Sequence, residues 1–285
     1  MKDIPVRSII PPTTDELDSF RIFSIREILA GEDMNQALHR HDFYFILLVS
    51  KGIGIHEIDF VAYPVIENSI YIMRPGQVHK LELNADCEGY WLAFNKEFEF
   101  LPNAKDKALW RGACSRNFYN LQKNEVIELS SIFQNLLDEY RCKQVRFEHV
   151  IKANLEVLLI HLLRYQQKNL DTSREVDLYQ QKKLQEFLDL LETNISTKKP
   201  AAAYADMVNL SPFQLNSITK NLLGKTVAEL IDDQIVLEAK RYLLGTANQI
   251  TEIAFQLGFI DVSYFIRFFK KKTGVTPEVF RRNFT

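Results

Sequence analysis

The chain has 285 residues and a formal net charge of −2. This length allows two domains with separate cores, and the near-neutral charge gives no whole-chain sign of a nucleic-acid partner. Cys87, Cys114 and Cys142 are odd in number and form no close-spaced metal pair, so we expect ordinary thiols. The N-terminus lacks a secretory signal and no apolar stretch could span a bilayer, so we expect a cytoplasmic protein with no membrane partner.

The first hundred residues are expected to form short β-strands. Aromatic and β-branched residues are concentrated in four runs, at 43–49, 54–59, 69–73 and 90–94, and Gly, Pro, Asn and Asp fall in the gaps. Many short strands separated by turn signals predict a small barrel or sandwich.

Histidines lie beside two of these runs. His39 and His41 precede the run at 43–49, and His79 follows the run at 69–73 in the segment Arg74-Pro-Gly-Gln-Val-His79. Alternation along a strand puts His39 and His41 on the same face as Phe43 and Phe45. These imidazoles could therefore converge on one point inside the barrel.

Two kinds of site could form there. The three histidines could hold a metal ion, with Glu57 as a candidate carboxylate ligand. Strand aromatics could instead line a pocket for a small molecule, although such residues are more often plain core. The candidates are Tyr44, Tyr63, Tyr71 and Trp91.

This layout resembles a cupin, and in particular the sensor domain that many AraC-type regulators carry ahead of their DNA-binding half, over about residues 20–100. The resemblance implies a pocket for a small organic effector, for which we select His39, His41, Tyr71 and His79. The cupin metal motif has a glutamate three to five residues after its second histidine, and none follows His41 there. We therefore assign no metal and no cofactor, and keep a metal site or simple hydrogen-bonded histidines as alternatives.

Residues 124–170 are expected to form two amphipathic helices that break near 141–144. Such helices need a partner surface. They could cover the barrel of their own chain or pair two chains, since helices at this position commonly form a dimer interface in the family. The polar stretch 169–176 is the expected linker, which gives a first domain at 1–168 and a second at 177–285.

Capping signals mark the helices of the second domain. An amphipathic helix carries Leu184, Phe187, Leu188 and Leu191. Ser211-Pro-Phe-Gln214 is a capping box that should start a helix at Pro212 and carry it to about Asn221. Thr226 and Glu229 repeat the box and open a helix to about Leu244, long enough to act as a rigid strut.

A second copy of this pattern closes the chain. A short helix should end at Gly258, and Asp261 should cap a basic helix that ends at Gly274. A shift of fifty residues superposes Leu215 on Phe265 and Gly224 on Gly274, although the second turn is one residue longer than the first. A helix, a tight turn and a second helix are the means by which proteins place a helix in the major groove of DNA.

These residues closely resemble the DNA-binding region of the AraC/XylS family of bacterial transcription regulators. The second repeat of that family matches the stretch from Ile253-Ala254 through Leu257-Gly258-Phe259 and Ser263-Tyr264-Phe265 to Gly274-Val-Thr-Pro277. The resemblance covers about the last hundred residues and implies two helix-turn-helix units, joined by one linker helix, that enter successive major-groove segments of double-stranded DNA. In the family the early part of each recognition helix meets the bases, which gives Phe213, Asn216 and Ser217 in the first unit and Val262, Ser263, Ile266 and Arg267 in the second.

The chain departs from the family pattern in the first unit. Ser217 and Thr219 stand where an arginine and a phenylalanine are common, and Ile235 replaces a frequent arginine of the linker helix. We therefore expect the first unit to bind weakly.

The basic residues of the two recognition helices have different expected roles. Arg267 is the leading candidate for base readout, because a guanidinium can pair with guanine through two hydrogen bonds. The lysines are candidates for phosphate contacts, although a lysine run at a helix end is usually a solvated face that favours the helix dipole. They are Lys220, Lys270 and Lys271.

The sequence thus predicts an α+β protein, with an N-terminal cupin-like β-barrel and following helices, and a C-terminal all-α domain with two helix-turn-helix units. We expect a sequence-specific transcription regulator, not an enzyme, controlled by a small-molecule effector. A homodimer is a further expectation, and RNA polymerase would be a partner if the protein is an activator. The alternative is a metal-dependent cupin enzyme with a helical appendage, whose ligands would be His39, His41 and His79.

Overall fold

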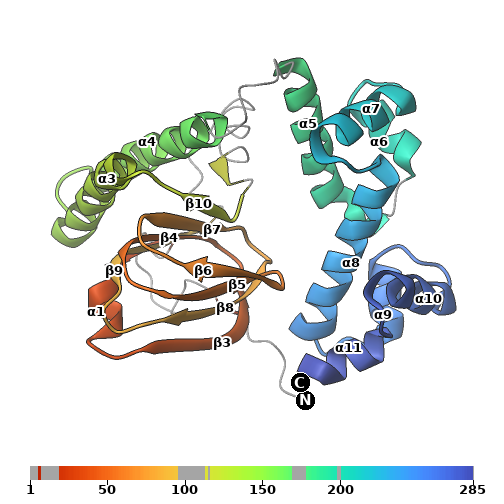
Figure 1. Cartoon of the computed structure of the whole chain (residues 1–285), viewed down its shortest axis with the longest axis horizontal. Coiled ribbons are helices and arrows are strands. Elements are labelled where there is room, and N and C mark those ends of the chain that lie inside the picture. The colour runs from red at the N-terminus through yellow and green to blue at the C-terminus, as the bar shows by residue number, and fades with distance from the viewer. Residues whose placement is uncertain are drawn as a thin grey trace. The chain divides into compact units, whose positions relative to one another are not determined.

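The computed structural model describes residues 6–7, 19–95, 113–114, 116–168, 178–197 and 200–284. The chain divides into an N-terminal unit within Pro5–Leu170 and a C-terminal unit within Asp171–Thr285. The first contains the strands and the helices α1, α3 and α4, and the second contains helices α5 to α11 (Figure 1). The linker expected at 169–176 lies outside the described residues. Within those residues, no helix is both long and apolar enough to cross a membrane.

The strands of the N-terminal unit form two five-stranded sheets in the described part of the chain. The first has the order β1-β3-β8-β5-β6 and the second the order β10-β7-β4-β9-β2. The strands are β1 (Val6–Arg7), β2 (Phe20–Ser24), β3 (Met34–His41), β4 (Tyr44–Lys51), β5 (Gly54–Ile58), β6 (Val61–Val65), β7 (Ser69–Met73), β8 (Val78–Leu83), β9 (Glu88–Phe94) and β10 (Phe118–Asn120). The predicted barrel or sandwich is therefore confirmed, with four predicted runs falling on β4, β5, β7 and β9.

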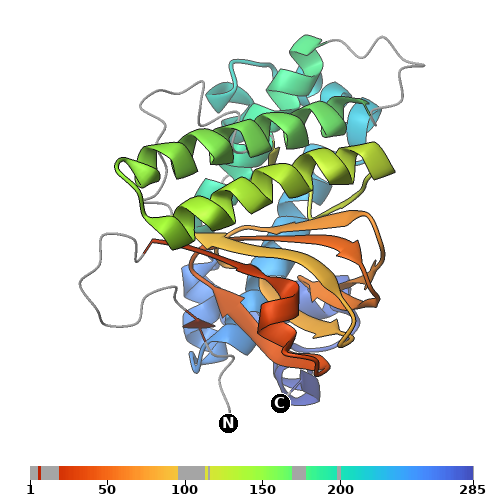
Figure 2. The same ribbon diagram turned by 90° about the vertical axis from the view of Figure 1, so that its left-hand side faces the viewer.

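Alternation along β4 separates two apolar cores. Phe45, Leu47 and Val49 belong to the core between the two sheets, whereas Ile46 and Leu48 pack in a second core with residues of two long helices. These helices, α3 (Lys123–Cys142) and α4 (Phe147–Lys168), lie side by side across one face of the strands (Figure 2). Both were predicted, and their apolar stripes pack within the chain. The short helix α1 (Ile25–Leu29) was not predicted.

The C-terminal unit contains two helix-turn-helix units, α6–α7 and α9–α10, at the two ends of α8 (Figure 1). Its elements are α5 (Leu178–Asn194), the 3-10 turn η2 (Ile195–Thr197), α6 (Ala201–Met207), α7 (Pro212–Leu223), α8 (Val227–Gly245), α9 (Ile250–Gln256), α10 (Val262–Thr273) and α11 (Pro277–Phe284). The predicted capping boxes form, since the backbone N–H of Gln214 donates to Ser211 Oγ and that of Glu229 to Thr226 Oγ1.

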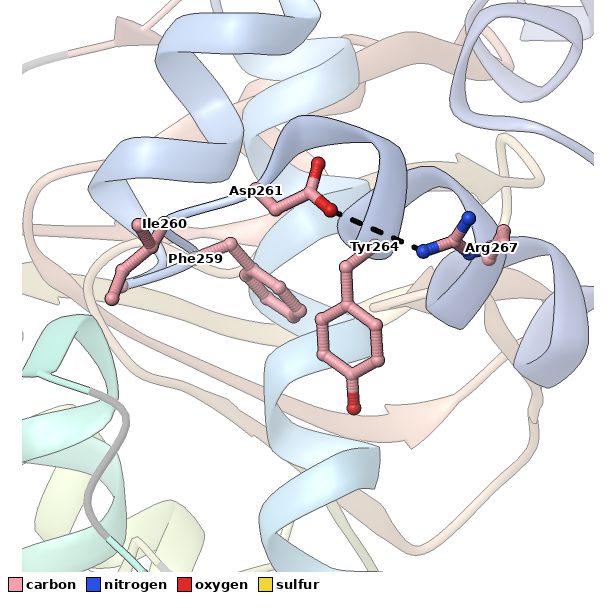
Figure 3. A pocket seen from close by; sticks show the side chains of 6 residues that line it. Phe259, Ile260, Asp261, Tyr264 and Arg267 are labelled. Carbon is pink, nitrogen blue, oxygen red and sulfur yellow. Dashed lines mark ion pairs between the residues drawn. The ribbon is translucent and has the colours of Figure 1, made fainter.

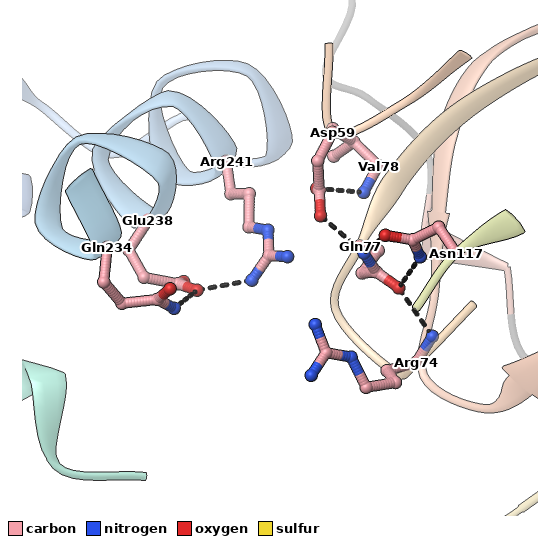
Figure 4. Close-up of polar contacts among 8 residues, drawn as sticks. All are labelled: Asp59, Arg74, Gln77, Val78, Asn117, Gln234, Glu238 and Arg241. Atoms are coloured by element: carbon pink, nitrogen blue, oxygen red, sulfur yellow. Dashed lines mark hydrogen bonds and ion pairs between the residues drawn. The ribbon is translucent and has the colours of Figure 1, made fainter. Parts of the chain in front are cut away.

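Polar contacts fix α8 against α10 of the second helix-turn-helix unit and against α11. The Arg281 guanidinium of α11 donates to the carbonyl oxygens of Leu243 and Asn248, both at 2.8 Å. Lys272 Nζ of α10 lies 2.9 Å from Asp232 Oδ2 of α8. Along α8 itself, Glu238 accepts a hydrogen bond from Gln234 and pairs with Arg241 (Figure 4). The contacts of Arg281 and Lys272 therefore tie α11 and α10 to the linker helix.

Candidate functional site

The turn of the second helix-turn-helix unit is one residue longer than the turn of the first. The structure identifies the added residue. Each turn passes through a left-handed residue, Asn209 at φ 55° and Gly258 at φ 77°. The next residue donates to the carbonyl of the preceding helix in both units, from Leu210 to Ala205 and from Phe259 to Ala254. The recognition helix is then capped by Ser211 in the first unit and by Asp261 in the second. The inserted residue is therefore Ile260, whose side chain is 95% exposed.

The second recognition helix, α10, presents a polar face beside this turn. Asp261 caps the helix by accepting the Ser263 N–H at 2.8 Å, and Phe265 and Phe269 anchor the opposite face in the core. Among the predicted contacts, Ser263, Arg267, Lys270 and Lys271 are exposed, whereas Val262 and Ile266 are half-buried.

A hollow of about 440 Å³ lies at the start of α10. Ile260, Asp261, Tyr264 and Arg267 line it together with Gly258 and Phe259 (Figure 3). The Arg267 guanidinium lies 4.0 Å from Asp261 Oδ2, and both side chains are more than half exposed. Such a pair contributes little in water, so Arg267 can leave it for a stronger partner.

The first recognition helix, α7, exposes three of its four predicted contacts. Phe213 is 83% exposed, and Ser217 and Lys220 are exposed as well. Asn216 is half-buried, and its Oδ1 accepts the Val227 N–H at 3.1 Å. This N–H belongs to the first turn of α8, where backbone donors lack partners within the helix. Asn216 therefore helps to fix α7 to α8. This structural role differs from the base contact that was predicted for it.

Asn216→Ala is expected to lower the free energy of unfolding by about 0.5–1.5 kcal/mol, because the Val227 N–H loses its acceptor. Urea unfolding of the full chain, followed by circular dichroism, measures this loss. The matched control is Ser217→Ala at the exposed neighbouring position, which should change stability by less than about 0.5 kcal/mol. An unchanged stability of the Asn216 variant would contradict the structural role.

In the N-terminal unit, four buried histidines meet between the two sheets. His39 and His41 lie at the end of β3, His79 on β8 and His56 on β5, all at most 5% exposed. His41 Nε2 is 2.6 Å from His79 Nε2, which is 3.0 Å from His39 Nε2. His56 Nε2 is 2.9 Å from His79 Nδ1. The predicted convergence of His39, His41 and His79 is confirmed, but these residues lie within strands and not beside them.

His56 was not predicted as part of the cluster. Burial, with His39 nearby, lowers the pKa of His56 to about 3, so its ring is neutral at physiological pH. Glu57 was predicted as a candidate carboxylate ligand beside the three histidines, and this prediction was wrong. Alternation along β5 puts His56 and Ile58 in the interior and Glu57 on the opposite face. The sequence does not fix this phase, because Ile55 and Ile58 are both apolar and lie on opposite faces, and the structure buries Ile58 but leaves Ile55 51% exposed.

A hydrogen-bonded turn between β7 and β8 positions His79. The side chain of Gln77 donates to Asp59 Oδ2 at 2.6 Å and accepts the Arg74 N–H at 2.7 Å (Figure 4). Asn117 also donates to Gln77, and the Gly76 N–H donates to the carbonyl oxygen of His41. The turn that leads into β8 is therefore tied to His41 at the end of β3 and to Asp59 directly after β5.

The aromatic residues predicted to line a pocket lie on two faces. Tyr71 is buried in the core between the sheets, where its hydroxyl donates to the Pro64 carbonyl at 2.7 Å, and its ring lies 5.4 Å from that of His56. Tyr63 and Trp91 pack against the same core. Tyr44 was wrongly included, because it packs against the core beneath α3 and α4.

The cysteines are free thiols, as expected. Cys87 and Cys114 are buried, and burial raises the pKa of the Cys114 thiol to about 12. A thiol that stays protonated is a poor nucleophile and a poor metal ligand.

A β-sandwich with a polar interior site, followed by two capped helix-turn-helix units, defines a ligand-binding DNA-binding regulator. Residues 25–159 match the family described as "AraC-like ligand binding domain", and residues 204–283 match the family described as "Helix-turn-helix domain". The chain belongs to the AraC family of transcription regulators.

Two named relatives and one solved structure are similar to this chain. Over 248 residues the chain is 23% identical to the HTH-type transcriptional activator RhaR of Mannheimia succiniciproducens, covering 87% of each protein. Over 101 residues it is 37% identical to the bifunctional transcriptional activator/DNA repair enzyme AdaA of Bacillus subtilis, covering 34% of this chain and 48% of AdaA. Among solved structures, ToxT from Vibrio cholerae O395 matches with a TM-score of 0.42 at 16% identity, covering 94% of this chain and 98% of ToxT.

Proposed function

We propose that this regulator recognises a specific DNA site with α7 and α10 in successive major-groove segments. The supporting observation is the pair of capped recognition helices at the two ends of α8, whose 19 residues span about 28 Å. One helical turn of DNA is about 34 Å, so a rigid spacer of this size suits two units that bind the same face of the duplex.

Within this proposal the two helices contribute unequally. In α10, Arg267 reads a base edge with Ser263 beside it, and Lys270 and Lys271 contact phosphates. In α7, Phe213 and Ser217 face the bases and Lys220 a phosphate. The half-buried Asn216 shapes the surface of α7, as Val262 and Ile266 do for α10. The exposed Ile260 adds an apolar contact, of the kind that recognises a thymine methyl group.

The experiment that tests the proposal is an unbiased selection of binding sites from random duplex pools with the full chain. Enrichment of one motif is the expected result, and a pool that stays random would contradict sequence-specific recognition. The selected motif then serves as the cognate site for the next measurement.

Arg267→Ala is expected to weaken binding to the cognate site by about 1–3 kcal/mol and to relax discrimination at one base pair, as for a lost bidentate contact. Lys270→Ala is the contrast, since a lost phosphate contact should weaken specific and random DNA alike and flatten the salt dependence. Arg26→Ala, at an exposed arginine of α1, is the matched control and should leave DNA affinity unchanged. Equal losses on cognate and random DNA for Arg267→Ala would contradict base readout by this residue.

The remaining parts of the proposal concern the N-terminal unit. The core between the sheets holds the ligand, with His39, His41, Tyr71 and His79 as contacts, and the protein is a regulator without an enzymatic activity of its own. We further propose a homodimer through the outer faces of α3 and α4. The names of its relatives suggest activation of transcription, for which we propose contact with RNA polymerase. We also propose a cytoplasmic location, where DNA is available. We place the domains at 1–168 and 177–285.

A further inference from the structure

We infer that His39, His41 and His79 form a binding site for a divalent transition-metal ion, through their Nε2 atoms, and that His56 positions His79 from behind. This inference deepens the proposed ligand-binding role of the N-terminal unit by naming the chemical class of one ligand. It does not depend on which DNA sequence the protein binds.

The first argument is the geometry of the nitrogen atoms. The three candidate ligand atoms lie within 4.8 Å of one another, and the two closest contacts measure 2.6 and 3.0 Å. In a tetrahedral site with Zn–N bonds of about 2.0–2.1 Å, ligand nitrogens stand about 3.3 Å apart. Small outward rotations of the rings would therefore admit an ion, without a change of strand register.

The second argument is the hydrogen bonding behind the ligands. His39 Nδ1 lies 2.8 Å from the carbonyl oxygen of Ala37, which can only accept, so Nδ1 carries the proton and Nε2 keeps its lone pair. His79 Nδ1 can donate in the same way to His56 Nε2 at 2.9 Å. Metal-binding histidines nearly always have such a partner on the second ring nitrogen, because it fixes the tautomer and the orientation of the ring.

Hydrogen bonds between the histidines, without a metal ion, explain the cluster less well than a bound ion does. His79 Nε2 can carry at most one proton, yet it faces the Nε2 atoms of both His39 and His41. One N–H cannot serve two acceptors well at these distances, and a contact without a proton brings two lone pairs together. A cation placed between the three lone pairs would satisfy all of them.

The donor set selects the class of ion. Three neutral imidazoles suit Zn²⁺, Co²⁺, Ni²⁺ or Fe²⁺, whereas Mg²⁺ and Ca²⁺ prefer oxygen ligands. The carboxylate of Glu57 lies on the opposite face of β5 and does not join the set. Three protein ligands leave at least one coordination position, which water or a polar group of an organic effector could fill.

The test uses the purified full chain, stripped with a chelator and titrated with Zn²⁺ and separately with Co²⁺. One ion per chain is expected, with Co²⁺ absorption bands typical of nitrogen ligands. His41→Ala and His79→Ala should abolish this binding. His56→Gln should weaken it by about 10–100-fold, the usual effect of losing the hydrogen-bond partner of a metal-binding histidine. His149→Ala, at an exposed histidine of α4, is the matched control and should bind as the wild type does.

Folding is checked by circular dichroism, and His41→Gln and His79→Gln replace any alanine variant that does not fold. The inference is overturned if the folded wild-type chain binds no ion, or if the His41 and His79 variants bind as tightly as the wild type. Because ion binding is measured without DNA, its failure leaves the site-selection experiment unaffected. Conversely, a chain that binds Zn²⁺ but selects no DNA motif would contradict the proposed function alone.

Discussion

Phe265→Ala is expected to lower the stability of the C-terminal unit by about 3–5 kcal/mol and to abolish DNA binding. The Phe265 side chain is 0% exposed, and its ring centroid lies 5.1 Å from that of Phe259 and 6.0 Å from that of Phe269. Removing this ring leaves a cavity where α10 meets the turn that leads into it, and the surrounding side chains can only partly refill it. Urea unfolding of the full chain, followed by circular dichroism, would show an earlier transition for the C-terminal helices.

Phe213→Ala is the matched control for this prediction. It removes the same side chain from the start of the other recognition helix, where the ring is 83% exposed, so stability should change by no more than about 0.5 kcal/mol. Its affinity for the selected DNA site should nevertheless fall, because an exposed ring at the start of α7 is a candidate base contact. Equal losses of stability in the two variants would contradict the exposed position of the Phe213 ring.

The helices of the C-terminal unit could be predicted because their signals are local. Ser211 with Gln214 and Thr226 with Glu229 form reciprocal hydrogen bonds between residues three apart, and they start α7 and α8 where expected. Gly258 likewise sets the turn before α10 through its own backbone conformation. No distant residue is needed to understand these features, so one sequence suffices to find them.

The features that could not be predicted from the sequence depend on contacts between distant segments of the chain. Asn216 accepts a hydrogen bond from a residue of the next helix, which no local pattern indicates. His56 reaches His79 because β5 and β8 are neighbours in one sheet, although β6 and β7 separate them in the chain. The pairing of β3 with β8 also contains a register shift between Gln36 and His39, which breaks simple alternation before the histidines.

The error at Tyr44 has a different physical cause. Strand β4 is buried on both faces, by the opposite sheet on one side and by α3 and α4 on the other. Aromatic residues are then favourable at every position, and composition cannot tell which of them faces the interior. Ile260 could not be identified from the sequence for another reason. The greater length of the second turn was visible in the sequence, but only the equivalent hydrogen bonds of Leu210 and Phe259 show which residue is added.

Gly89→Ala is expected to destabilise the N-terminal unit by about 2–6 kcal/mol, because overpacking adds to backbone strain at one position. Gly89 has φ 142°, and a Cβ atom there would lie 1.9 Å from the carbonyl oxygen of Leu48 on β4. The obstacle is backbone, so it cannot rotate away as a side chain would. The two strands would have to separate where Gly89 of β9 is paired with Val49 of β4.

Gly31→Ala separates the two causes of this loss. Gly31 also has a positive φ, at 87°, but nothing lies within 4 Å of the added Cβ atom. Gly31→Ala should therefore lower the free energy of unfolding only through backbone strain, by about 1–2 kcal/mol. Thermal unfolding of both full-length variants measures the difference. Equal losses of stability in the two variants would mean that β4 and β9 can separate at little cost in free energy. The close contact between the strands at Gly89 would then not matter for the stability of this sheet.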